Sequence, residues 1–126
     1  MQHPRVVRGS EAGTLSPHVI GGKAANLVRL QGAGLPVPSW FCVTTAVFRD
    51  VAAAAWTVVD QELGRFDARD QQRASDISAR ATKAIHDTGL TDPDRAALRD
   101  CFRHLAAESP FAAVRSSVSD EDSAAA

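Results

Sequence analysis

The sequence predicts a mixed α/β protein of the α+β kind, with a small sheet and about four helices. Its composition is that of a globular protein, since 44% of the 126 residues are hydrophobic and 23% are charged. Segments with helical apolar spacing alternate with short strand-like runs, in the order helix–strand–helix–helix–helix–strand. So few strands make a small sheet, whose edges are expected to need strands from outside this sequence.

Charge and hydropathy exclude several classes of partner. Fourteen basic and 15 acidic residues give a formal net charge of −1, which offers no electrostatic attraction for nucleic acid or an anionic membrane. No run of about 18 apolar residues is present, and the N-terminus lacks the apolar core of a signal peptide. We therefore expect a cytoplasmic protein, in which Cys42 and Cys101 are buried thiols rather than a disulfide.

The first half of the chain predicts two helices around a strand. Residues 1–20 are weakly patterned, with a possible short strand at Val6–Val7. A helix is expected to follow Gly21–Gly22 in KAANLVRLQGAG, and Gly32 and Gly34 near its end are stop signals. Pro36 and Pro38 then force an extended entry into a strand over residues 40–43. The next helix carries helical apolar spacing at Val47, Phe48, Val51 and Ala55, with Thr44 or Thr45 as its cap.

The second half predicts two further helices and a strand. Residues 56–69 are ambiguous, with helix continuing to about Leu63, and a third helix over about 70–87 ends at Gly89. Its expected buried stripe is Ala74, Ile77, Ala81 and Ile85. The fourth helix has the clearest start, TDPD, which combines a capping Thr91 or Asp92, a proline for the first turn and the negative charge of Asp94. Its apolar face is Ala97, Leu98, Cys101, Phe102 and Leu105, and after Pro110 residues 111–116 read as a strand.

The first candidate for chemistry is Gly21–Gly22–Lys23. Glycines at the start of a helix let a ligand approach the backbone closely, and a lysine there adds a positive charge suited to phosphate. The spacing differs from that of a Walker A loop. From spacing alone, a flexible turn followed by a solvated lysine is the favoured interpretation.

The second candidate is Arg115, at the end of the last expected strand. A guanidinium beside the hydroxyls of Ser116 and Ser117 is well suited to holding phosphate oxygens. A surface arginine paired with Asp120 or Asp122 remains equally open. The acids Asp120, Glu121 and Asp122 could bind Mg²⁺ but receive no metal role, because adjacent loop acids are more often simply solvated. The histidines show neither metal-ligand spacing nor a nucleophile partner, and their positions are His3, His18, His86 and His104.

Two signatures taken together resemble a known family. The segment GGKAANLVRLQGAGLPVPSWFCVTT resembles the opening of the ATP-binding domain of the phosphoenolpyruvate synthase, pyruvate phosphate dikinase and rifampin phosphotransferase family. Downstream, AAVRSSVSDEDS resembles that family's second signature, an arginine-serine-serine strand end followed by an acidic loop. Residues 56–109 match only in kind, so about a third of the chain carries the resemblance.

The resemblance implies an ATP-grasp type fold and a phosphotransferase function. In the family, the residues that match Lys23 and Arg115 contact ATP phosphates, and Arg115 is the expected catalytic residue. Gly22, Ser116 and Ser117 are expected to line the same site. The family reaction cleaves ATP to AMP and phosphate while a phosphoryl group passes through a histidine to pyruvate, a drug hydroxyl or another acceptor.

The resemblance also implies that residues 1–126 are the N-terminal part of such a domain, incomplete at its C-terminus. After Ser123 the alanine-rich end replaces the family's serine-phenylalanine-alanine-glycine stretch. The Mg²⁺ ligands, the remaining ATP-binding part and the phosphohistidine domain are expected in cis or on a separate chain, so the chain alone should not complete a turnover. The alternative is a non-catalytic interaction module that keeps the fold, whereas the double signature makes a chance resemblance the weakest interpretation.

Overall fold

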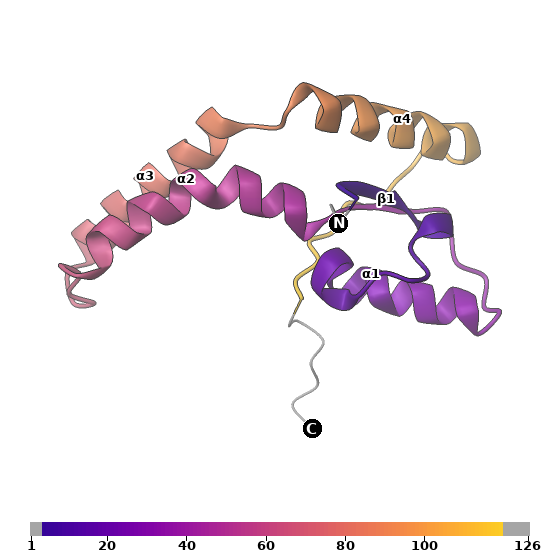
Figure 1. Ribbon diagram of the computed structural model, residues 1–126, viewed down its shortest axis with the longest axis horizontal. Helices are drawn as coiled ribbons and strands as arrows, with labels where there is room; N and C mark the ends of the chain where they lie inside the picture. Colours follow the sequence, from indigo (N-terminus) through magenta and orange to yellow (C-terminus); the bar gives the residue numbers. More distant parts are fainter. Residues whose placement is uncertain (1–3, 120–126) are drawn as a thin grey trace. The chain divides into compact units, whose positions relative to one another are not determined.

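The computed structural model describes residues 4–119 and divides the chain into two compact units (Figure 1). The first unit comprises Met1–Val47 and Thr91–Ala126, and the second is Phe48–Leu90. The four α-helices and two short strands within the described residues confirm the coarse α+β prediction. No helix of the described residues is long and apolar enough to cross a membrane.

The two strands form the sheet of the first unit. β1 (Val6–Arg8) pairs antiparallel with β2 (Phe41–Val43), with Val7 opposite Cys42. The 3-10 helix η1 (Gly9–Glu11) follows β1 directly. Its first N–H donates to the carbonyl of Trp40 at 2.8 Å, which extends the contact beyond the ladder. Both strands lie where the apolar runs predicted them.

The core of the first unit joins this sheet to α1 (Pro17–Gly32). Small side chains on α1 let the helix backbone lie close to the sheet. Trp40 and Cys42 pack partly buried against the same cluster. The buried members of this core are Val7, Ala12, Val19, Ile20, Ala24 and Ala25.

α1 begins earlier than the sequence predicted. The Ser16 hydroxyl accepts the N–H of His18 at 3.1 Å, and Pro17 occupies the first turn, a favourable combination for a helix start. Gly21, with φ 81° and ψ 163°, interrupts the helix rather than preceding it. A helical segment therefore does follow the glycine pair, as predicted, and what the sequence analysis missed is the short helical turn from Pro17 to Ile20.

The predicted stop of α1 is confirmed. Gly34 has φ 78° and donates its N–H to Gln31, while the N–H of Leu35 reaches back to Leu30 at 3.1 Å. This pair of hydrogen bonds is a Schellman motif, which favours glycine at its left-handed position.

α4 (Asp92–Glu108) completes the described helices of the first unit. The Thr91 hydroxyl accepts the N–H of Asp94 at 3.3 Å, so Thr91 is the cap, one of the two residues predicted for that position. On its expected apolar face Cys101 is buried, whereas Phe102 is 48% exposed and touches Phe41 edge-to-face, with ring centroids 5.1 Å apart. The threonines expected to cap α2 bond elsewhere through their hydroxyls, since Thr44 donates to Pro4 and Thr45 to His18.

The expected strand over residues 111–116 is not formed. The segment has no regular secondary structure, and Phe111 and Val114 are each 87% exposed. A strand needs a neighbour to complete its hydrogen-bond ladder. Among the described residues β1 and β2 pair with each other, and neither forms a ladder with this segment.

The second unit contains most of α2 (Thr45–Leu63) and all of α3 (Gln71–Thr88). Asp70 caps α3 and Gly89, at φ 61°, ends it, which confirms the predicted bounds. Glu62 joins the helices by accepting hydrogen bonds from Arg73 and Arg80, which hold the pKa of its carboxyl below the ordinary value. The stripe on α3 is only half-buried and Ile85 is 38% exposed, so its predicted burial was wrong.

Cys42 and Cys101 are both free thiols, as predicted, but only Cys101 is buried, whereas Cys42 is half-buried. This partial burial raises the pKa of Cys42 to about 11. At pH 8 the reactive thiolate fraction of Cys42 should thus be about 100-fold below that of an exposed cysteine. We expect iodoacetamide to label Cys42 at least that much more slowly in the native protein than after unfolding in guanidinium, measured by peptide mass spectrometry. Equal labelling rates in both states would contradict the burial of this thiol.

Candidate functional site

Lys23 stands on α1 two residues after the interruption at Gly21. The residues around it, Ile20, Gly22 and Ala24, are buried, and Lys23 itself is half-buried. Its backbone is therefore anchored in the core of the first unit. This anchoring gives the start of its side chain a fixed position, while the ammonium group lies at the end of a four-carbon stem.

The segment that carries Arg115 lies against the same interruption of α1. The N–H of Gly22 donates to the carbonyl of Val118 at 3.1 Å, and the Ser117 hydroxyl donates to the carbonyl of Ile20 at 3.4 Å. In Figure 1 the yellow segment after α4 reaches the N-terminal end of α1. The structure thus brings the two sequence signatures together.

The five residues expected at a phosphate site have different environments. Arg115 and Ser116 are exposed, whereas Gly22 is buried and its N–H already has an acceptor. The Ser117 hydroxyl is likewise engaged, with Ile20. Gly22 and Ser117 therefore join the two segments, and the positive charges come from Lys23 and Arg115.

The structure shows no cluster of metal ligands within residues 4–119. No group of three or more histidine, cysteine, aspartate or glutamate side chains among them could hold a metal ion. The acids Asp120, Glu121 and Asp122 lie outside the described residues, as does His3. His86 and His104 are exposed on their helices.

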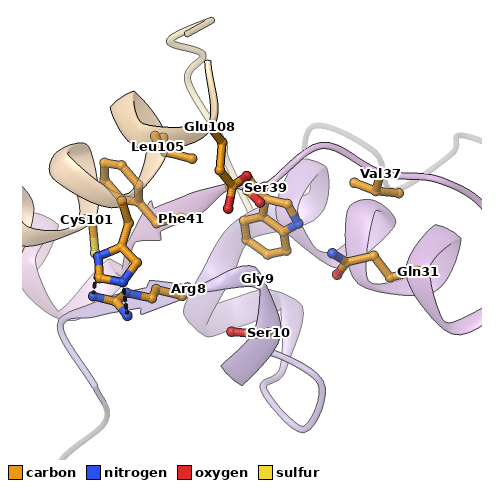
Figure 2. Close-up of a pocket in the computed structure, with 12 residues that line it drawn as sticks. Arg8, Gly9, Ser10, Gln31, Val37, Ser39, Phe41, Cys101, Leu105 and Glu108 are labelled. Carbon is orange, nitrogen blue, oxygen red and sulfur yellow. Dashed lines mark hydrogen bonds between the residues drawn. The ribbon is translucent and has the colours of Figure 1, made fainter. Parts of the chain in front are cut away.

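A second feature of the first unit is a cavity of about 240 Å³ that the sequence did not indicate (Figure 2). Its walls come from β1 and η1, the C-terminal end of α1, the irregular segment that leads into β2, the first residue of β2, and α4. Their residues are far apart in the sequence and form no motif, so sequence analysis could not find this cavity. Its polar lining includes Arg8, Ser10, Gln31, Ser39, His104 and Glu108.

The charges in this cavity are largely compensated. Arg8 Nη2 donates to Asp100 at 2.6 Å and lies 3.3 Å from Nδ1 of His104. The side chain of Cys101, and then the charge of Asp100, raise the pKa of the Arg8 guanidinium. Since Arg8 already has a carboxylate partner and Glu108 adds a negative charge, the cavity is poorly suited to a phosphate group.

Comparisons with known proteins show the family to which the chain belongs. Residues 17–126 match the family described as pyruvate phosphate dikinase, AMP/ATP-binding domain. The chain is 37% identical over 107 residues to a rifampicin phosphotransferase of a Streptomyces species, covering 82% of this chain and 12% of that protein. It is 28% identical over 110 residues to a probable phosphoenolpyruvate synthase of Methanothermobacter thermautotrophicus, covering 82% of this chain and 16% of that protein.

A third relative matches a shorter part of the chain. The prodigiosin synthesizing transferase PigC of Serratia marcescens is 52% identical over 44 residues, which cover 35% of this chain and 5% of that protein. No solved structure matches the chain significantly. The chain therefore spans a small part of the length of its curated relatives. It belongs to the family of the pyruvate phosphate dikinase AMP/ATP-binding domain.

Proposed function

We propose that this chain supplies part of the ATP site of a dikinase-like phosphotransferase with an ATP-grasp type fold. The observation that carries the proposal is the contact between Ile20–Gly22 and Ser117–Val118, which brings together the segments that bear Lys23 and Arg115. Family membership supports ATP as the ligand. In this proposal Lys23 and Arg115 contact the phosphates from two walls of one site.

The two cations have complementary roles in the proposed site. The ammonium group of Lys23 acts as a point charge on the triphosphate, and the guanidinium of Arg115 can donate two parallel hydrogen bonds to phosphate oxygens. The exposed hydroxyl of Ser116 adds a donor beside Arg115. Gly22 and Ser117 line the site by holding its walls together.

The proposed reaction cleaves ATP to AMP and phosphate, with a phosphoryl group passing through a histidine to an acceptor. Arg115 would stabilise the charge that develops on the transferring phosphoryl group, which is where such enzymes gain most of their rate. Mg²⁺ would neutralise further phosphate charge, and we expect its ligands outside this chain. Pyruvate, a drug hydroxyl and other acceptors remain equally compatible with the described residues.

The Lys23→Ala substitution tests the proposed ATP site in the full-length protein. Loss of one charge-assisted phosphate contact should weaken the binding of ATP with Mg²⁺ at least about tenfold, as measured by calorimetry. Lys83→Ala is the matched control, because Lys83 is 74% exposed on α3 and pairs with Asp87. The control should bind ATP like the wild type.

The outcomes separate the proposal from its alternative. If Lys23→Ala bound ATP as tightly as the control Lys83→Ala, the proposed site would be contradicted. The alternative, a non-catalytic interaction module, would gain support if a protein partner bound the chain equally well with and without Lys23→Ala and Arg115→Ala.

A further inference from the structure

We infer that Gly21 is a positioning residue of the ATP site: the absence of a side chain at Gly21 seats Ser117 against α1 and thereby sets where Arg115 lies relative to Lys23. The inference rests on the proposed function, because it needs Lys23 and Arg115 to share one ligand. It assigns a role to a glycine that touches neither the nucleotide nor the reacting atoms.

The first support is the conformation of Gly21. Its φ of 81° and ψ of 163° lie in a region that essentially only glycine occupies. This geometry divides α1 into a short first turn and a longer second part, and it leaves the Ile20 carbonyl and the Gly22 N–H to bond outside the helix. The interruption therefore supplies the two polar groups that meet Ser117 and Val118.

The second support is the space above Gly21. A Cβ built at Gly21 would lie 2.2 Å from Oγ and 2.9 Å from Cβ of Ser117, closer than real Cβ atoms come to any neighbour. It would also lie 3.2 Å from the backbone carbonyl carbon of Ser117. Rotation of the Ser117 side chain would relieve only part of this overlap, so the segment itself would have to move away from α1.

The third support is the short chain length between this contact and the two cations. Lys23 follows Gly21 by two residues and Arg115 precedes Ser117 by two, and two residues of extended chain span at most about 7 Å. A displacement at the contact is therefore carried almost directly to Arg115. Lys23 would stay in place, because its neighbours Ile20 and Ala24 are buried in the core.

Gly21→Ala in the full-length protein tests the inference, with Gly34→Ala as its matched control. Both glycines have a positive φ; Gly21 interrupts α1 and Gly34 follows its end. Nothing lies within 4 Å of a Cβ built at Gly34. Both variants should lower the melting temperature through backbone strain. Only Gly21→Ala should also weaken the binding of ATP with Mg²⁺, by about tenfold or more, while Gly34→Ala stays within about threefold of the wild type.

A structural readout accompanies the binding measurement. The Gly22 amide donates to Val118, so its hydrogen exchange should become at least about tenfold faster in Gly21→Ala and stay unchanged in Gly34→Ala. Adding Ser117→Gly to Gly21→Ala removes both atoms within 3 Å of the new Cβ. The double variant should therefore bind ATP more tightly than expected from adding the losses in binding free energy of Gly21→Ala and Ser117→Gly.

The outcomes distinguish this inference from the proposed function. If Lys23→Ala weakens ATP binding but a folded Gly21→Ala binds like Gly34→Ala, the positioning role is wrong and the ATP site stands. If Lys23→Ala leaves ATP binding unchanged, the proposed function falls, and the inference with it. Should Gly21→Ala not fold, Ser117→Ala replaces it: about threefold weaker ATP binding with faster Gly22 exchange supports the contact, and no change in either overturns it.

Discussion

Arg115→Ala should reduce the rate of phosphoryl transfer at saturating ATP by about 10²–10³-fold in the full-length protein. This is the usual cost of removing one preorganised donor that acts on charge developing in the transition state. Arg115 is exposed and lies outside any regular element, so its removal should leave the folded structure intact. Single-turnover measurement of AMP formation reports the chemical step directly.

Two further variants make this result specific. Arg115→Lys keeps the charge but loses the bidentate geometry, so it should recover only part of the rate. Arg103→Ala removes another exposed arginine, on α4, and should leave the rate unchanged. A rate for Arg115→Ala equal to that of Arg103→Ala would contradict a catalytic role for Arg115.

Local signals in the sequence predicted the elements well where local chemistry decides them. The cap at Thr91, the glycine that ends α1 and the glycine that ends α3 all act within one turn of helix. The strands β1 and β2 were predicted because each is a short apolar run next to a residue or segment that does not favour a helix. Such runs are typical of short strands. Each of these features depends on residues close together in the sequence.

The failures have a shared physical cause, which is dependence on distant partners. Residues 111–116 alternate like a strand but have no strand paired with them among the described residues. The apolar stripe on α3 has the right spacing, yet its depth of burial depends on what packs against it. Periodicity identifies a face of an element but contains no information about the surface that covers that face.

The candidate site shows the same division. The residue types of Lys23 and Arg115 suggested phosphate chemistry, but the sequence alone left a solvated lysine and a surface arginine open. Only the fold shows that Gly22 bonds to Val118 and that Ser117 occupies the space above Gly21. The cavity beside Arg8 went unnoticed for the same reason, since its walls come from segments that are far apart in the sequence.

Asp94→Ala should lower the free energy of opening of α4 by about 2–3 kcal/mol, towards the range for breaking a buried ion pair. Asp94 is 2% exposed and accepts hydrogen bonds from Nε and Nη2 of Arg5 at 2.7 and 2.8 Å. Its charge also lies in the first turn of α4, where it favours the helix dipole. We expect a loss below that range because the Arg5 side chain is 36% exposed and can be hydrated once its partner is removed. Native-state hydrogen exchange of α4 amides in the full-length protein measures this energy.

A second arginine–aspartate pair on α4 provides the control, and pH provides an independent check. Arg8 and Asp100 meet at 2.6 Å, but Asp100 is 62% exposed, so Asp100→Ala should cost less than about 1 kcal/mol.

The hydrogen bond from Arg5 holds the pKa of Asp94 below its ordinary value, against the opposing effect of burial. The stabilisation by Asp94 is therefore fully present above about pH 4, the unfolded pKa, and is lost as pH falls further. Asp94→Asn should remove this acid-dependent loss, and equal acid sensitivity of wild type and Asp94→Asn would contradict the assignment.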